Sequence, residues 1–313
     1  MLDINPRRRL GPGRTLASAA VFVIALAAVH GAQAQQRADE ASDVTVASPR
    51  WAPGLGPHVA VDRAHGNFHT IEGRYSPFAR LLANDGYVVT SFDSEVTAEA
   101  LADVDVLVIA NARGGRIGNL RALSTPAFAA GEIDALRQWV LAGGSLFLIA
   151  DHAPFPSAVT SLAASFGVHW DNGYADGPGD DDVDIFSIED GTVSAGEVLQ
   201  RQGRPVRQVR SFTGSSFLAP PAAEILLPLG EGWRVYVADE NDQISPDGPS
   251  FSAARRAQLA ALQVGEGRVV VAAEAAMFTS QRFDDEAVPE GFASAGATDN
   301  RMAVLNLLEW LSR

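Results

Sequence analysis

Polar side chains capable of acid, base or ligand chemistry follow four separate apolar runs of the sequence. The residues concerned are Asp62, His65, Asn67 and His69 in DRAHGNFH, Asn111 after VDVLVIA, Asp151 and His152 after SLFLIA, and Glu274 after RVVVAA. Three of the six histidines of the chain lie in two of these strings. Imidazole and carboxylate groups exchange protons or coordinate ions, so these positions are the first candidates for a functional site.

Two kinds of chemistry fit this set. Asp151, His152 and His65 are the candidate catalytic residues, because a carboxylate and two imidazoles can form a general acid–base set for hydrolysis. The candidate ligand-binding residues are Asp62, Asn67, His69, Asn111 and Glu274. The alternative is structural, because aspartates after strands often cap helices and hold loops in place.

A divalent metal is a further possibility, since nitrogen and oxygen donors of this kind suit Zn²⁺. The string HGNFH, however, lacks the glutamate of the HExxH motif, and Gly66 disfavours a regular helix there. The acidic run at residues 179–184 does not follow the spacing of an EF-hand and is more typical of a solvated loop. The sequence indicates no other cofactor.

The elements that must position these residues alternate between strand and helix. Apolar runs at residues 58–61, 87–90, 104–110, 145–150 and 268–273 predict strands. Amphipathic stretches around Phe78, Leu136 and residues 157–166 predict the intervening helices. This order predicts βαβ crossovers and an open, mostly parallel sheet of flavodoxin-like α/β type, with helices on both faces.

Two later parts of the chain depart from this alternation. Short strand-like pieces among Gly, Asp and Pro predict a β-rich insertion or edge over residues 168–250. The apolar pattern then predicts a helix near residues 251–262 and a final helix carrying Val304 and Leu308, with Asp299 as its N-cap.

In an open parallel sheet, ligands bind beyond the carboxyl ends of the strands. We therefore expect Asp62, His65, Asn111, Asp151 and His152 to share one pocket there. Carboxylates converging at neighbouring strand ends repel one another. A shared proton, a histidinium or a cation must then compensate them.

The first 34 residues have the pattern of a cleavable signal peptide. Four arginines precede an apolar run at residues 16–28, and Ala32 and Ala34 supply the small residues of a cleavage site. We expect cleavage after Ala34, export to the periplasm or beyond, and no membrane span after processing. Residues 35–57 read as a flexible linker, and residues 58–313 as a single α/β domain.

The composition excludes several classes of function. The formal net charge is −14, and removing the four arginines and one aspartate of the leader leaves −17, so we expect no nucleic-acid partner. Every basic residue is arginine, which rules out Schiff-base lysines and a Walker-type phosphate loop. The chain has no cysteine, so disulfides and thiolate nucleophiles are also excluded.

Several strings resemble the class I glutamine amidotransferase-like superfamily and, within it, the uncharacterised DUF4350-type group. They are VDRAHGNFHT, DGYVVTSF, DVLVIANA, GGSLFLIADHAPF, VRSFTGSSF, AEAAMFTSQ and DNRMAVLNLLEWL. The resemblance implies a flavodoxin-like core. True members carry a nucleophilic cysteine in the turn that corresponds here to Ala150-Asp151-His152, so glutamine hydrolysis through a thioester is not possible.

Two functions remain open at this stage. The first is a non-glutaminase binding module that takes a small polar, sugar-like ligand or a cell-envelope protein. The second is a hydrolase built on the Asp/His site, with or without a metal.

Overall fold

The central sheet has the strand order β3-β2-β4-β5-β17-β16-β12-β6 in the computed structural model, which describes residues 36–114, 125–179, 184–201, 203–212, 214–283 and 289–313. Five neighbouring strands run parallel: β3 (Val88–Phe92), β2 (His58–Asp62), β4 (Val106–Ala110), β5 (Ser145–Ile149) and β17 (Gly267–Ala272). Antiparallel pairs complete the sheet through β16 (Ala257–Val264), β12 (Phe217–Leu218) and β6 (His169–Trp170), with β13 (Glu224–Pro228) also on β16. The predicted mixed, mostly parallel α/β fold is confirmed.

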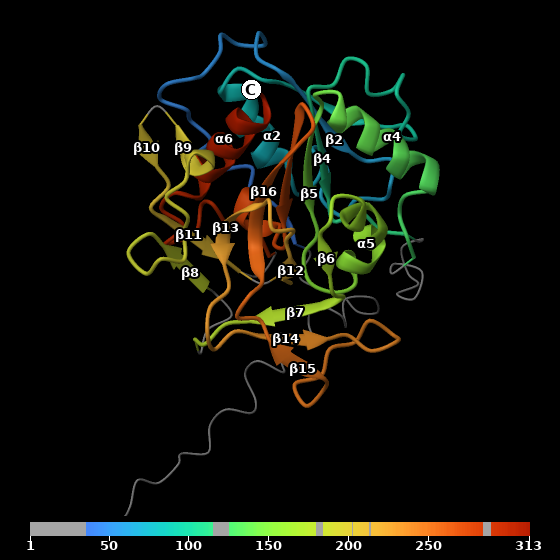
Figure 1. The fold of residues 1–313 in the computed structure, drawn as a ribbon. Helices are drawn as coiled ribbons and strands as arrows, with labels where there is room; N and C mark the ends of the chain where they lie inside the picture. The colour runs from blue at the N-terminus through green and yellow to red at the C-terminus, as the bar shows by residue number, and fades with distance from the viewer. Residues whose placement is uncertain (1–35, 115–124, 180–183, 202, 213, 284–288) are drawn as a thin grey trace, which may run out of the picture. The chain divides into compact units, whose positions relative to one another are not determined.

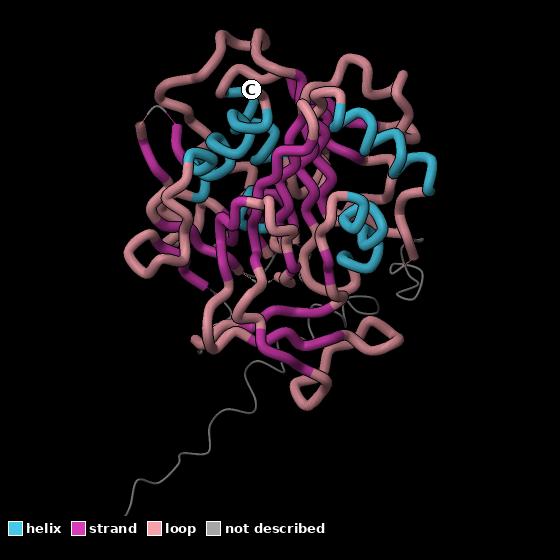
Figure 2. Tube along the Cα trace, in the orientation of Figure 1, coloured by secondary structure: helices cyan, strands magenta, loops and turns pink. Residues whose placement is uncertain are grey.

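Helices cover both faces of this sheet, as Figures 1 and 2 show. Val106 and Val108 of β4 pack in one apolar cluster with α2 (Ser76–Asn84) and α6 (Asn300–Leu311). The alternate residues Leu107 and Ile109 pack in a second cluster with α4 (Ala130–Leu141) and α5 (Phe155–Ser165). A strand covered on both faces needs apolar side chains at every position, which explains the unbroken run VLVIA.

The β-rich stretch that follows α5 forms small antiparallel sheets. A three-stranded sheet contains β7 (Gly173–Asp176), β14 (Arg234–Val237) and β15 (Ser250–Ser252). Two-stranded sheets pair β8 (Asp184–Ser187) with β11 (Gln208–Ser211) and β9 (Gln200–Arg201) with β10 (Arg204–Pro205), with the short helix η1 (Glu197–Leu199) before β9. The Ala153 amide donates to the Gly173 carbonyl at 2.9 Å, so β7 begins beside the turn after β5.

The helix expected near residues 251–262 is wrong, because this segment forms β15 and the long strand β16. Alanine, leucine and glutamine favour helices in isolation, but Gly265, at φ 61°, turns the chain back into β17. All residues from Ala257 to Leu262 are buried in the sheet. Tertiary pairing therefore overrides local propensity here.

The last helix begins after Asp299 as expected, but its carboxylate does not cap that helix. It accepts hydrogen bonds from the Arg207 and Gln208 amides at 2.8 and 3.1 Å.

The segment expected as a linker lies along the domain. Its strand β1 (Arg37–Ala38) pairs with β18 (Ser280–Arg282), which also pairs with β19 (Glu290–Gly291). Asp39 forms an ion pair with Arg282 at 2.8 Å, and the ring of Trp51 lies 4.4 Å from that of Tyr87. The polar composition suggested a linker, whereas ion pairs and one aromatic contact fix this segment to the domain. The leader at residues 1–34 lies outside the described residues.

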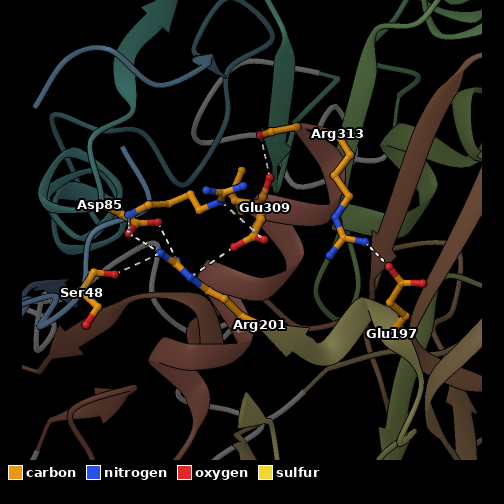
Figure 3. Close-up of polar contacts among 9 residues, drawn as sticks. Ser48, Asp85, Glu197, Arg201, Glu309 and Arg313 are labelled. Carbon is orange, nitrogen blue, oxygen red and sulfur yellow. Dashed lines mark hydrogen bonds and ion pairs between the residues drawn. The ribbon is translucent and has the colours of Figure 1, made fainter. Parts of the chain in front are cut away.

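A buried ion network occupies the amino edge of the sheet (Figure 3). Asp85, which directly follows α2, accepts two hydrogen bonds from the Arg201 guanidinium, each at 2.6 Å. Arg201 Nε also lies 3.2 Å from Glu309 of α6. Burial lowers the pKa of Arg201, but the two carboxylates more than offset it and raise the pKa overall. The network therefore joins α2, β9 and α6.

No helix in the described part of the chain is long and apolar enough to cross a membrane.

Candidate ligand site at the carboxyl edge of the sheet

Four parallel strands that are neighbours in the sheet end in the polar residues identified from the sequence. Asp62 ends β2, and Asn111, Asp151 and Glu274 follow β4, β5 and β17 by one or two residues. Since β2 pairs with β4, β4 with β5, and β5 with β17, these ends lie along one edge of the sheet. The predicted neighbourhood of β2, β4 and β5 is confirmed.

His65 lies between two carboxylates. Its Nδ1 is 2.9 and 3.0 Å from the oxygens of Asp62, and its Nε2 is 2.9 Å from Glu132 at the start of α4. Its ring packs 4.1 Å from that of Phe128. Burial lowers the pKa of His65, but Asp62 and Glu132 raise it further than burial lowers it. Both ring nitrogens are engaged, so His65 acts here as a charged bridge between β2 and α4.

Two asparagines tie the strand ends together. Asn67 accepts a hydrogen bond from the Ala110 amide at 3.0 Å and donates to Asp62. Asn111 accepts from the Asp151 amide at 2.8 Å and donates to His69 Nδ1 at 3.2 Å. Asn111 has φ 56°, in the left-handed region that asparagine tolerates better than most residues. Hydrogen bonds therefore link the ends of β2, β4 and β5 in sequence.

His69 is fully enclosed and holds an unused donor. Because its Nδ1 accepts from Asn111, the assigned proton lies on Nε2, and that atom is buried without a hydrogen-bond partner. Burial, followed by the charge of Arg74, lowers the pKa of His69 to about 3, so the ring is neutral at physiological pH. The side chain of Gln281 in β18 lies beside it, and both of its amide atoms are also buried without partners.

Glu274 is the most deeply buried acid at this edge. Its two oxygens accept from the amides of Ala276 and Met277, each at 2.7 Å, in the short helix η2 (Ala276–Phe278). Burial and the charge of Asp151 raise the pKa of Glu274 well above its ordinary value. The expected charge compensation thus takes two forms, a histidinium beside Asp62 and a bound proton on Glu274.

Asp151 and His152 are adjacent, but their side chains are engaged separately. The Asp151 carboxylate accepts from the His152 backbone amide at 2.8 Å. The His152 ring nitrogen Nδ1 donates to the Ala153 carbonyl at 2.8 Å, and the ring lies 6.4 Å from those of Phe155 and Tyr174. The structure brings Asp151 to Asn111 and His69, whereas the rings of His65 and His152 have their own partners.

Two arginines at this edge were not anticipated from the sequence. The guanidinium carbons of Arg74 and Arg113 lie 3.7 and 5.2 Å from the ring centroid of Phe68. Neither forms an ion pair with any described residue. Their side-chain hydrogen bonds go to the carbonyls of Phe68 (3.4 Å) and Gly66 (2.7 Å). The only signal in the sequence was that Arg113 comes two residues after Asn111.

The described residues contain no group of three His, Asp or Glu side chains arranged to hold a metal ion. The metal alternative thus has no ligand set at this edge within that part of the chain. Most of the acidic run, residues 180–183, lies outside the described residues.

Comparison with known proteins gives a fold and no family. No protein-family model and no curated sequence matches the chain. Among solved structures, the N-terminal domain of mmIFT52 is similar with a TM-score of 0.57, 16% identity, and coverage of 82% of this chain and 97% of that one. At that identity the similarity shows a shared fold alone.

Two weaker similarities were also found. A protein described as ThuA-like from Bacteroides uniformis has 10% identity and a TM-score of 0.41 over 85% of this chain and 93% of its own. A protein described as a GMP synthase component from Thermoplasma acidophilum has 7% identity and a TM-score of 0.40, covering 81% of this chain and 93% of that one.

Proposed function

We propose that this is an exported binding protein that takes a small polar ligand at the carboxyl edge of its sheet. One observation carries the proposal: the Nε2 donor of His69 and both amide atoms of Gln281 are buried side by side without partners. Leaving such groups unpaired costs about 1–3 kcal/mol each, which a ligand would recover. A ligand rich in hydroxyl groups, such as a sugar, both donates and accepts hydrogen bonds and suits this mixture.

The same geometry favours binding over hydrolysis. Both nitrogens of His65 are held by carboxylates, so it lacks a free nitrogen with which to take a proton from water or substrate. The chain has no cysteine, so a thiolate nucleophile is absent from the turn after β5. The hydrogen-bonded row of Asn67, Asn111 and Asp151 is a rigid frame of the kind that holds a ligand in one orientation.

Two finer assignments belong to this proposal. Assignment to the DUF4350-type group rests on strings such as VDRAHGNFHT and GGSLFLIADHAPF, which are those that form the site. Export rests on the tripartite leader before Gln35. Sequencing the N-terminus of protein recovered from the cell envelope tests export: Gln35 supports it, and an intact Met1 contradicts it.

A ligand screen tests the binding site. We would measure the melting temperature of the protein with neutral sugars, sugar acids, amino acids and phosphorylated metabolites, and then titrate each stabilising compound by calorimetry. The diagnostic variant is Gln281→Leu, which replaces an unpaired buried amide with an apolar group of similar size. It should fold with unchanged or slightly higher stability, because no hydrogen bond within the protein is lost.

The matched control is Asn306→Leu in α6, whose amide is also buried without partners but lies among the apolar residues of the helix. The proposal expects affinity to fall at least about tenfold in Gln281→Leu, equivalent to about 1.4 kcal/mol, and to be retained in Asn306→Leu. Equal binding by both variants, or catalytic turnover of the compound, would contradict it.

A further inference from the structure

Two positive charges at the carboxyl edge have no negative partner within the described residues. Arg74 and Arg113 both lie over the ring of Phe68, so their guanidinium carbons are separated by at most the sum of 3.7 and 5.2 Å. Burial and the charge of Arg113 lower the pKa of Arg74 to about 10, which still leaves it charged at neutral pH. Arg74 Nε is buried without a hydrogen-bond partner.

Such an arrangement is unfavourable in the empty protein. Like charges held near one ring repel each other, and a partly buried guanidinium has lost water without gaining a carboxylate. The charge is also unusual for this chain, whose net charge is −14 and whose nearby strand ends carry Asp62, Asp151 and Glu274. None of these acids forms an ion pair with either arginine.

We infer that Arg74 and Arg113 form a subsite for an oxyanion, so that the ligand of the proposed site carries a carboxylate or phosphate group. A guanidinium presents several N–H donors in one plane, which match the oxygens of such a group at about 2.8 Å. An anion between the two guanidiniums cancels their repulsion and supplies the acceptors that both lack. This inference rests on the proposed function and specifies the class of its ligand.

The subsite adjoins the unpaired groups already described. The Arg74 carbonyl accepts from Thr279 Oγ1 at 2.8 Å, two residues before Gln281. Phe68 and His69 are consecutive, and the charges of both arginines lower the pKa of His69. The anionic group therefore binds at Arg74 and Arg113, while the remainder of the ligand reaches His69 and Gln281.

Inorganic phosphate and acetate are the probes for this subsite. We would measure the melting temperature of the full chain against either anion, with chloride at matched ionic strength as the reference, for the wild type, Arg74→Met and Arg113→Met. The control is Arg255→Met, which removes the same charge from an exposed arginine. Phosphate and acetate are both expected to stabilise the wild type and Arg255→Met, with apparent affinity at least about tenfold weaker in the two site variants.

A second measurement uses the wild type alone. Phenylglyoxal modifies accessible guanidiniums, and peptide mass spectrometry locates the modified arginines. Phosphate should slow modification of Arg74 and Arg113 several-fold and leave Arg255 unchanged. Unspecific stabilisation shared by all variants, together with no protection of Arg74 or Arg113, would overturn the inference.

The two proposals fail in different ways. If neutral compounds bind and depend on Gln281 while phosphate and acetate have no effect, the proposed function stands and the oxyanion subsite is wrong. If anion binding depends on the arginines but no compound is sensitive to Gln281→Leu, the subsite stands and the proposed polar pocket is wrong.

Discussion

The two edges of the sheet hold buried arginines in opposite circumstances. At the amino edge, Arg201 is 4% exposed and is held by Asp85, which is fully buried, and by Glu309 (Figure 3). At the carboxyl edge, Arg74 and Arg113 are partly buried and meet an aromatic ring, two backbone carbonyls and each other's charge. One set of charges is complete within the chain, and the other is incomplete.

This contrast separates a structural role from a binding role. Removing a member of a complete network leaves its partners buried and uncompensated, which destabilises the fold. Removing a member of an incomplete set leaves nothing unpaired, so stability is kept and only ligand binding changes. Carrying unfavourable groups at a site and favourable ones elsewhere is a common compromise between function and stability.

The largest effect is expected at the amino edge. Arg201→Met leaves Asp85 and Glu309 buried without their cation, so the free energy of unfolding should fall by about 3–5 kcal/mol in urea denaturation. Arg207→Met, which breaks an exposed pair with Glu189, should cost no more than about 1 kcal/mol. Equal losses for the two variants would show that the network is not the main anchor of this edge.

A smaller loss is expected where the carboxyl edge is internally bonded. Asn111→Ala removes the acceptor of the Asp151 amide and should reduce the free energy of unfolding by about 1–3 kcal/mol. Asn111→Gly loses the same bonds but accepts φ 56° without strain, so it should be less destabilised than Asn111→Ala. The reverse order would mean that backbone conformation does not matter at this strand end.

Two histidines of the same loop should respond to pH with opposite signs. The raised pKa of His65 means that its stabilisation is complete below the unfolded value of about 6.5 and is lost as pH rises through the folded pKa. The pKa of His69 is lowered to about 3, so protonation of the unfolded chain removes its stabilisation as pH falls below about 6.5.

Variants isolate these two contributions. The stability gap between wild type and His65→Gln should be largest near pH 5–6 and shrink at higher pH, where the bridge loses its proton. The gap to His69→Gln should shrink on acidification, by at most about 1.4 kcal/mol per pH unit. Gaps that are flat with pH for both variants would contradict the assigned protonation states.

The smallest effect is expected for Arg113→Met. Its guanidinium makes one hydrogen bond to a carbonyl and no ion pair with a described residue, so the free energy of unfolding should change by less than about 0.5 kcal/mol. A loss as large as that of Arg201→Met would mean that Arg113 is part of the framework and not of a binding site.

The sequence was sufficient for the parallel half of the fold and for the order of its strand ends. Continuous apolar runs such as VLVIA indicate strands covered on both faces, and polar residues after them mark one edge. It was insufficient for β16, whose helix-favouring residues are drawn into the sheet by a hairpin with β17. Pairing across the chain has no local signature.

The candidate site was predicted in part for the same reason. Asp62, Asn111, Asp151 and Glu274 were identifiable because they end strands that a parallel sheet brings together. The partner of His65 is Glu132, 67 residues away at the start of α4, and Gln281 lies on a strand held by residues 37–38. Contacts between loops so distant in sequence cannot be read from spacing.

The most direct test of the central claim is a high-resolution crystal structure of the wild-type protein grown with phosphate or with the best compound of the screen. We predict a bound oxyanion in contact with both Arg74 and Arg113, with the rest of the ligand within hydrogen-bond distance of His69 Nε2 or the Gln281 amide. A structure in which carboxylates of the chain itself pair with both arginines, leaving no room for a ligand, would contradict the account.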